Sequence, residues 1–358
     1  MTAPVYIIAE AGVNHNGDLD RALAMVDAAA GAGADAVKFQ TFRPEALVTG
    51  SARQADYQVR NDGDAGSQLA MLQRLVLGPE DHHALMARCA AHGIEFLSSP
   101  FDPGSADFLV HELGLQRIKL GSGELTNGPL LLQLARAGRD LILSTGMATL
   151  DEVREALGVV AFGYLKHGDP RDRAALSAAL DLPEAHDALR QRVTLLHCTT
   201  EYPCPLDQVN LRAMDTLANA FDLPVGYSDH TLGIEVSIAA AARGATLLEK
   251  HFTLDRRLPG PDHVASLEPD ELAALVKAVR AVSLALGSHH KTPTAAEQRN
   301  AQVARKSLVA ARAIAAGEPF SATNLTIKRP GHGRSPLDYW DLLNRPSPRD
   351  YNADEVIE

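Results

Sequence analysis

Eight short apolar runs recur between Val5 and Thr253, and each of them ends in polar or ionisable residues. Most consecutive runs are separated by a stretch with helical periodicity, such as residues 19–32, 79–92 and 150–160. Strand and helix alternating eight times is typical of a parallel (β/α)8 barrel, also called a TIM barrel. The predicted strands cover residues 5–11, 36–42, 95–101, 117–123, 141–146, 193–199, 223–230 and 246–253.

The ends of these runs carry the residues that a catalytic mouth needs. In a barrel of this kind the carboxyl ends of the strands converge on one face, where catalytic groups gather. A surface rim is polar by default, so one such residue says little, but all eight ends carry them. The residues are Glu10, Lys38, Gln40, Ser98, Ser99, Lys119, Ser122, Glu124, Ser144, Thr145, Thr200, Tyr202, Ser228, His230, Glu249 and His251.

The chain is longer than a barrel alone requires. It has 358 residues, whereas a bare barrel needs roughly 250, which leaves room for a second domain. We predict a barrel domain over residues 1–288, a polar linker over 289–303 and a small C-terminal domain over 304–358. A tail of that length is small for independent stability, so we expect it to pack against a barrel, its own or a partner's.

Composition excludes several classes of function. The net charge of −11 argues against a nucleic acid or an anionic membrane as partner. The apolar runs are too short to span a membrane, and the start of the chain lacks the pattern of a secretory signal. Three cysteines do not form a disulfide framework. We therefore expect a cytoplasmic protein.

Two histidines end neighbouring predicted strands. His230 closes the seventh run and His251 closes the eighth, so their imidazoles are expected to lie side by side at the barrel mouth. Two neutral imidazoles with oxygen ligands and an open position suit Mn²⁺, Fe²⁺, Co²⁺ or Zn²⁺, and such an ion polarises a carbonyl. A single buried histidine is more often structural, but this pairing favours a metal site.

A predicted anion site surrounds the fourth strand. Lys119 and Ser122 belong to the segment KLGSGE, whose glycines allow backbone N–H groups to approach a ligand. Lys38 adds a second cation from another strand, and further hydroxyl donors come from Ser99, Ser144 and Ser228. Two cations and several donors facing one point suit a phosphate or a carboxylate.

Three carboxylates, Glu10, Glu124 and Glu249, are placed at the same mouth. Burial raises the pKa of a carboxyl group, so one of them could serve as a general acid or base. The alternative is that they form structural ion pairs with Lys38 and Lys119. The sequence alone leaves both interpretations open.

The residues then match a known family over nearly the full length of the chain. The chain resembles the bacterial sialic acid synthase (N-acetylneuraminate synthase) family of nonulosonic acid synthases. The matching segments are IIAEAGVNHNGD, VKFQTF, LSSPFD, KLGSGE, STGMATLDEV, LLHCTTEYPCP, GYSDHT, EKHFTLDR, PGPDH and KRPGHG. The resemblance implies a barrel followed by an antifreeze-like (SAF) domain, in a domain-swapped homodimer where each tail covers the partner's active site.

The resemblance also implies the reaction. Phosphoenolpyruvate condenses with an N-acetylated amino sugar aldehyde of the N-acetylmannosamine type, giving a nine-carbon sialic acid and phosphate. Mn²⁺, or another divalent ion such as Co²⁺ or Mg²⁺, would be held by His230 and His251. The family likeness assigns phosphoenolpyruvate to Lys38, Ser99, Lys119, Ser122, Ser144 and Ser228; the sugar to Glu10, Gln40, Tyr202 and Asp262; proton transfer or water activation to Glu124 and Glu249; and the N-acetyl group to Arg329 of the neighbouring subunit.

Two departures bear on the substrate. Thr200 stands where some members carry asparagine next to phosphoenolpyruvate. The excursion over residues 163–192 and the segment CTTEYP resemble the branch that includes legionaminic acid synthases. The alternative substrate is therefore 2,4-diacetamido-2,4,6-trideoxymannose, with Tyr202 and the loop around Asn61 facing the substituents that differ.

Two rival functions follow from the same residues. A Schiff-base aldolase would use Lys38 or Lys119 as the covalent nucleophile at a strand end. A carbohydrate-binding protein built on the tail, with an inactive barrel, is the non-enzymatic alternative.

Overall fold

The computed structural model describes residues 4–62, 66–165 and 168–358. Its contacts divide the chain into two compact units, Met1–Gly287 and Ser288–Glu358. In the described part of the chain, no helix is both long enough and apolar enough to cross a membrane.

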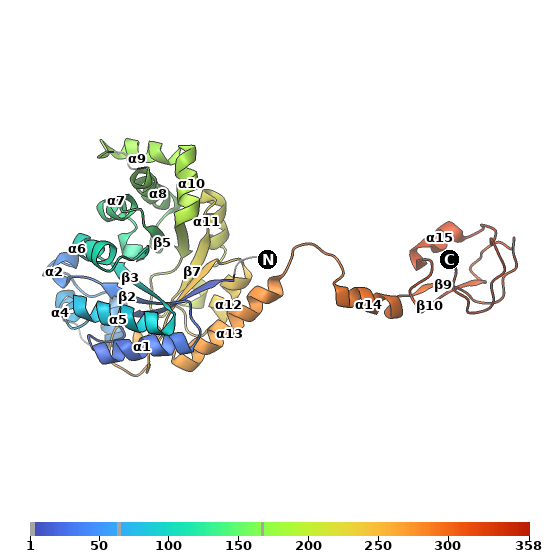
Figure 1. Cartoon of the computed structure of the whole chain (residues 1–358), viewed down its shortest axis with the longest axis horizontal. Coiled ribbons are helices and arrows are strands. Elements are labelled where there is room, and N and C mark those ends of the chain that lie inside the picture. Colours follow the sequence, from blue (N-terminus) through green and yellow to red (C-terminus); the bar gives the residue numbers. More distant parts are fainter. Residues whose placement is uncertain (1–3, 63–65, 166–167) are drawn as a thin grey trace. The chain divides into compact units, whose positions relative to one another are not determined.

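The first unit is a ring of eight parallel strands surrounded by helices (Figure 1). Its strands pair in the order β3-β2-β1-β8-β7-β6-β5-β4, and β3 also packs against β4, which closes the ring. The predicted (β/α)8 barrel is confirmed. The strands are β1 (Tyr6–Gly12), β2 (Ala36–Thr41), β3 (Glu95–Pro100), β4 (Arg117–Leu120), β5 (Asp140–Ser144), β6 (Val193–His197), β7 (Val225–Asp229) and β8 (Leu247–His251).

Local signals place the outer helices. The side chain of Asp18 caps the first turn of α1, and Thr149 forms a capping box with Glu152 at the start of α8. Gly93 ends α5 with a φ of 69°, a left-handed conformation that glycine adopts without strain. The outer helices are α1 (Leu19–Gly31), α5 (Pro79–His92), α6 (Pro103–Asp107), α7 (Gly128–Arg136), α8 (Leu150–Tyr164), α11 (Ala213–Phe221), α12 (Glu235–Ala242) and α13 (Pro269–Leu286).

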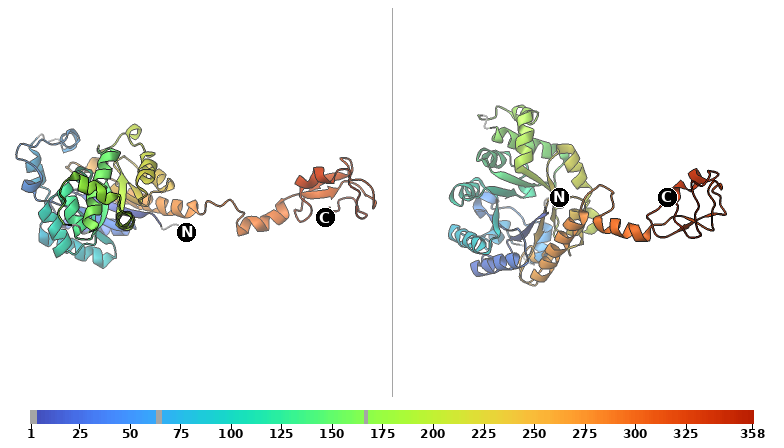
Figure 2. Two further views of the ribbon diagram at one scale, coloured as in Figure 1. Left: turned by 90° about the horizontal axis from the view of Figure 1, so that it is seen from above. Right: turned by 45° about the vertical axis from the view of Figure 1, so that its right-hand side comes forward.

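Two excursions interrupt the barrel. The predicted one holds α9 (Arg173–Leu180) and α10 (Pro183–Arg192), while its residues 166–167 lie outside the described part. The other, between β2 and β3, was not predicted and holds α2 (Pro44–Leu47), α3 (Asp56–Asp62) and α4 (Gln68–Gln73). In the left view of Figure 2 this blue segment stands out from the barrel. Met71, Leu72 and Leu75 give it a small apolar core of its own, together with Val13 and Phe42.

An apolar layer fills the inside of the barrel. It consists of Ile8, Ala36, Leu97, Ile142, Leu196 and Leu247, with Tyr6 packed against it. Side chains on a strand alternate between its two faces, so the residue two positions after each of these also points inward. The next layer toward the strand ends is therefore fixed by the period of two along each strand.

The second unit is built on an antiparallel pair, β9 (Ser307–Ala310) and β10 (Leu325–Lys328). Leu308, Ile314, Phe320 and Tyr351 belong to its separate apolar core. It also contains α15 (Tyr339–Leu342) and, within the segment predicted to be a linker, the helix α14 (Ala295–Ala304). Arg329 directly follows β10 and is exposed.

Candidate active site

One cavity of about 420 Å³ gathers every barrel residue to which we assigned a role in binding or catalysis. The strand period explains this, because Glu10, Lys38 and Glu249 each follow a residue of the apolar layer by two positions. Two other strand-end residues do not line the cavity: Ser98 Oγ lies 2.7 Å from Thr41 Oγ1, and Thr145 Oγ1 donates to Leu196 O at 2.9 Å. Arg329 belongs to the second unit and is described there. The predicted residues that line the cavity are Glu10, Lys38, Gln40, Ser99, Lys119, Ser122, Glu124, Ser144, Thr200, Tyr202, Ser228, His230, Glu249, His251 and Asp262.

The floor of the cavity is a chain of alternating buried charges. Lys38 Nζ lies 2.6 Å from Glu10 Oε2 and 3.7 Å from Glu249 Oε2, and Lys119 Nζ lies 3.0 Å from Glu249 Oε1. Ser228 Oγ donates a further hydrogen bond of 2.8 Å to Glu249. Of the two interpretations left open by the sequence, ion pairing is the one that the structure displays for Glu10 and Glu249.

These two carboxylates differ in pKa. Burial raises the pKa of Glu10 to about 7, against the attraction of Lys38. Burial also opposes ionisation of Glu249, but Lys119, Lys38 and the Ser228 hydrogen bond together hold its pKa below the usual value. Glu249 is therefore the permanent anion of the floor, and Glu10 changes charge near neutral pH.

Glu124 stands apart from this chain of charges. It accepts a hydrogen bond of 2.7 Å from Asn127 Nδ2, and burial raises its pKa in spite of that bond. A buried carboxyl group with a raised pKa beside a polar cavity has the properties of a proton donor or acceptor.

The two histidines face each other across the seventh and eighth strand ends, with ring centroids 5.7 Å apart. His230 Nδ1 donates to the carbonyl oxygen of Thr199 at 2.6 Å, which leaves Nε2 as the unprotonated nitrogen. Burial lowers the pKa of His230 to about 4 and that of His251 well below its usual value. Both rings are therefore neutral, the form in which imidazole binds a metal ion.

These residues fit a divalent ion with two protein nitrogen ligands. His251 Nδ1 is buried, has no hydrogen-bond partner in the part of the chain that the structure describes, and lies 4.0 Å from Asp262 Oδ2. Among the described residues, no group of three His, Cys, Asp or Glu side chains is placed to hold an ion. Substrate or water oxygens would have to complete the coordination of an ion bound here.

Unpaired hydroxyls surround the lysines. Ser144 Oγ and Thr200 Oγ1 are buried and have no hydrogen-bond partner among the described residues. Ser122 Oγ lies 3.1 Å from both the Gly146 amide, which donates to it, and Cys198 Sγ. A Cβ on Gly146 would stand 2.5 Å from Thr200 Oγ1 and 2.7 Å from Ser122 Oγ, so only glycine leaves this cradle open. Gly146 was not among the predicted site residues, although it lies in the segment STGM.

Aromatic rings cover the histidines. The ring of Tyr202 packs on His230 with centroids 4.1 Å apart and on Tyr57 with centroids 4.9 Å apart. Tyr57 comes from α3, and an ion pair of 2.8 Å between Arg60 and Glu201 joins the same helix to the loop after β6. Sequence analysis missed Tyr57, because it belongs to the unpredicted excursion.

Asn61 uses its side chain for the backbone of two loops. Its Nδ2 donates to the carbonyl oxygens of Tyr202 at 3.1 Å and Pro261 at 2.8 Å. Tyr57 and Gln58, one turn earlier on α3, line the cavity instead. The segment around Asn61, which we expected to be a loop, is therefore helical and reaches the site through these neighbours.

Side chains of the segment NHNG, which follows β1, anchor the loop after β8 by hydrogen bonds. Asn14 Nδ2 donates to Phe252 O at 2.8 Å and to Ser266 Oγ at 2.9 Å, and Asn16 Nδ2 donates to Pro259 O at 2.8 Å. Because Asp262 lies between these anchor points, its side chain is presented to the cavity by a fixed loop.

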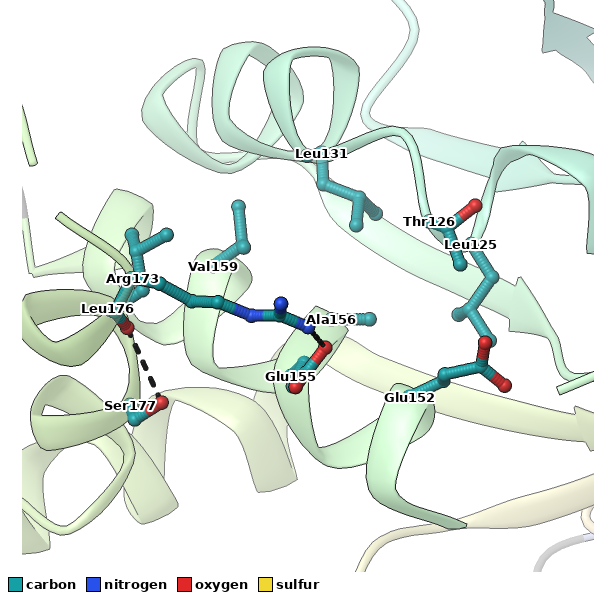
Figure 3. Close-up of a pocket in the computed structure, with 11 residues that line it drawn as sticks. Leu125, Thr126, Leu131, Glu152, Glu155, Ala156, Val159, Arg173, Leu176 and Ser177 are labelled. Atoms are coloured by element: carbon teal, nitrogen blue, oxygen red, sulfur yellow. Dashed lines mark hydrogen bonds and ion pairs between the residues drawn. The ribbon is translucent and has the colours of Figure 1, made fainter. Parts of the chain in front are cut away.

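A second hollow, of about 270 Å³, lies outside the barrel between α7, α8 and α9 (Figure 3). Arg173 of α9 forms an ion pair there with Glu155 of α8. Its walls include Leu131 and Leu176 but none of the predicted site residues, so we assign it no part in the chemistry.

Comparisons with known proteins agree with this geometry. The model of the NeuB family matches residues 25–291, and that of the SAF domain matches residues 305–358. N,N'-diacetyllegionaminic acid synthase of Campylobacter jejuni is 47% identical over 98% of each chain. The enzyme of the same name from Legionella pneumophila is 44% identical over 94% of this chain and 89% of its own.

A solved structure extends the match to three dimensions. N-acetylneuraminic acid (sialic acid) synthetase from Leptospira borgpetersenii is 34% identical, covers 83% of this chain and 90% of its own, and superposes with a TM-score of 0.67. The resemblance and the SAF domain predicted from the sequence are confirmed. The chain therefore belongs to the NeuB family, with a SAF domain following its barrel.

Proposed function

We propose that this protein condenses phosphoenolpyruvate with 2,4-diacetamido-2,4,6-trideoxymannose, giving N,N'-diacetyllegionaminate and phosphate. The observation that carries the reaction type is one cavity in which two lysines, unpaired hydroxyls and two neutral imidazoles meet. The choice of sugar is supported by the two relatives named as N,N'-diacetyllegionaminic acid synthases. N-acetylmannosamine, which sequence analysis placed first, is the second candidate, supported by the sialic acid synthetase structure.

The residues of the floor divide the work between the two substrates. Lys38 and Lys119 hold the phosphate and carboxylate of phosphoenolpyruvate, with Ser99, Ser122, Ser144, Thr200 and Ser228 as neutral donors. Gln40, Tyr202 and Asp262 orient the sugar so that its aldehyde carbon lies against C3 of phosphoenolpyruvate. In the complex, the anionic groups of phosphoenolpyruvate take the place of the glutamate carboxylates as partners of Lys38 and Lys119.

The reaction forms one C–C bond, consumes one water molecule and moves both protons of that water. C3 of phosphoenolpyruvate attacks the aldehyde carbon, whose oxygen takes up a proton, and positive character develops at C2. Water adds to C2 and loses a proton to Glu124, whose pKa is raised by burial, with Glu10 nearby as a further proton carrier. Glu249, which both lysines hold ionised, is the weaker candidate for this step. Phosphate leaves by C–O cleavage while the new C2 hydroxyl gives up its proton, so that C2 becomes the keto group of a nine-carbon acid. One of the two water protons thus balances the proton taken up by the aldehyde oxygen, and the other leaves with the phosphate.

His230 and His251 are the residues that would hold a divalent ion, Mn²⁺ or in its place Co²⁺ or Mg²⁺. Bound there, such an ion supplies Lewis-acid polarisation of the sugar aldehyde. The chain's part is to keep both imidazoles neutral by burial and to keep Asp262 beside His251.

The test is a coupled assay of phosphate release with phosphoenolpyruvate, Mn²⁺ and a panel of acetamido sugars, with products identified by mass. We expect turnover to be fastest with the diacetamido trideoxy sugar, to stop in chelator and to return with Mn²⁺. Faster turnover of N-acetylmannosamine would transfer the assignment to N-acetylneuraminate. Full activity in chelator would remove the metal from the proposal.

The Schiff-base alternative conflicts with the charge state of Lys38. Burial favours a neutral amine on Lys38, but Glu10 and Glu249 outweigh it and raise its pKa, so the amine stays protonated and is a poor nucleophile. Borohydride treatment with substrate should leave no covalent adduct, and an adduct on Lys38 or Lys119 would favour the aldolase. A sugar-binding tail beside an inactive barrel is disfavoured by the complete cavity.

We further propose a domain-swapped homodimer in which Arg329 of one subunit contacts the sugar's N-acetyl group in the other. Arg329→Ala should raise the KM for the sugar far more than that for phosphoenolpyruvate. Lys328→Ala, next to it and also exposed, is the matched control.

Mixing two impaired variants, at a sugar concentration well below the KM of Arg329→Ala, tests the swap itself. Subunits carrying His251→Ala, mixed and reassembled with subunits carrying Arg329→Ala, contain one intact swapped site in each mixed dimer, or about a quarter of all sites. No recovery of activity in such mixtures would contradict the swap. The three free cysteines also suit the cytoplasm, where we propose the protein works.

A further inference from the structure

One side of the active-site cavity is lined mainly by apolar side chains that pack on one small core. We call this side the apolar wall and define it as Val13, Leu47, Val48, Met71, Leu75 and Phe101. Most of it comes from the excursion between β2 and β3, which also supplies three polar side chains to the cavity lining, Tyr57, Gln58 and Gln68. The floor of the same cavity, in contrast, consists of lysines, carboxylates, hydroxyls and imidazoles.

The apolar wall is a packed surface. Met71 and Leu75 are 2% and 6% exposed, and they belong to a small core with Val13. Phe101 stacks edge-on against Phe42 behind the wall, with ring centroids 6.2 Å apart. Such a surface holds its shape and cannot turn hydrogen-bonding groups toward a ligand, because its side chains carry none.

The wall cannot serve phosphoenolpyruvate. That substrate is anionic at both ends, and the groups suited to it, Lys38 and Lys119, are on the floor at the strand ends. The sugar is therefore the substrate that meets the wall.

The orientation of the bound sugar determines which of its atoms contact the apolar wall. Its aldehyde carbon must reach His230, His251 and the floor, where C–C bond formation takes place. The other end of the open sugar molecule then extends outward into the layer of loops that follow the strands, and the excursion is part of that layer. The atom farthest from the aldehyde is C6.

We propose that the apolar wall receives the C6 methyl group of a 6-deoxy sugar and selects against sugars that carry a hydroxyl there. This specificity rests on the proposed function and names the part of the site that chooses within it. A methyl group gains by burial against Val48, Met71 and Leu75, whereas a hydroxyl group buried there loses its water without gaining a partner. An apolar pocket of this kind discriminates by roughly tenfold to a hundredfold in kcat/KM.

The experiment uses four sugars and the full-length enzyme. All four sugars are 2-acetamido mannose derivatives. They combine either acetamido or hydroxyl at C4 with either hydrogen or hydroxyl at C6, so that each position is tested separately. In the unaltered enzyme, we expect the 6-deoxy member of each pair to have the higher kcat/KM, by roughly tenfold or more. The preference should be similar for both C4 substituents.

Two substitutions make the wall polar without changing its shape. Val48→Thr and Met71→Gln together place a hydroxyl and an amide where C6 is expected, and should reduce the preference for 6-deoxy sugars at least fivefold, roughly. Val76→Thr is the matched control, since Val76 packs on the same small core but is not among the cavity-lining residues. It should retain the preference of the unaltered enzyme.

The outcomes separate this inference from the proposed function. If no acetamido sugar releases phosphate from phosphoenolpyruvate, the proposed function fails first. If the sugars react but the C6 pairs differ less than about twofold, or if the polar variant keeps the full preference with unchanged thermal stability, the apolar wall does not read C6 and the inference is overturned. A loss of preference in Val76→Thr equal to that in the polar variant would overturn it too.

Discussion

The floor and the apolar wall of the cavity are built in different ways. Each floor residue is at a strand end, and its inward direction follows from the period of two that also places Ile8, Leu97 and Leu247 in the layer below. The wall is held by Met71 and Leu75 on an excursion with its own small core. The difference teaches that the barrel fixes the bond-forming chemistry, while an inserted loop segment, free to vary without disturbing the barrel, fixes the choice of sugar.

The largest effect should come from breaking the floor. His251→Ala removes one of two nitrogen ligands and should lower Mn²⁺-dependent kcat by roughly a thousandfold or more, while circular dichroism and thermal unfolding stay near those of the unaltered protein. Steady-state assays across Mn²⁺ concentrations measure this. His111→Ala, which alters an exposed imidazole, is the control. Unchanged activity in His251→Ala would remove the metal site from the floor.

A smaller effect is expected at the edge of the wall. Tyr57→Ala removes a ring that packs on Tyr202, and should raise the KM for the sugar roughly tenfold with little change in the KM for phosphoenolpyruvate. Tyr57→Phe keeps the ring and should restore most of the affinity. Equal increases in both KM values would mean that α3 supports the floor as much as the wall, and the comparison would lose its basis.

The same difference between the floor and the apolar wall explains which parts of the site could be predicted from the sequence. The strand ends were predictable, because a strand repeats every two residues and Lys38, Glu249 or His251 falls on a fixed face. The excursion over 43–76 has no such period. Its position depends on Phe42 and Val13 packing against Met71 and Leu72, contacts between residues far apart in the sequence.

The protonation states of the carboxylates in the cavity could not be predicted from the sequence either. Glu10, Glu124 and Glu249 were equivalent candidates there, whereas the structure separates them by partner. Glu249 contacts both lysines, Glu10 contacts Lys38 alone, and Glu124 contacts Asn127. A pKa depends on distances of a few ångströms between strands, which a motif does not specify.

The smallest expected effect concerns the pH dependence of the floor, and it separates Glu10 from its neighbours. Burial raises the pKa of Glu10 to about 7, so below that pH the carboxyl is neutral and only Glu249 competes with phosphoenolpyruvate for the charge of Lys38. As the pH rises through that value, Glu10 ionises and competes for Lys38. The Kd for phosphoenolpyruvate should therefore increase with pH, by roughly fivefold between about pH 6 and pH 8.

Glu10→Gln should flatten this dependence, since the amide stays neutral at every pH and leaves Lys38 paired with Glu249 alone. Titration calorimetry of both proteins measures the effect. The ligand's own titration contributes equally to the two data sets, so their difference isolates Glu10. If the two curves run parallel, Glu10 stays ionised beside Lys38 throughout, and the floor then behaves as a rigid set of ion pairs, with no more adaptability than the apolar wall.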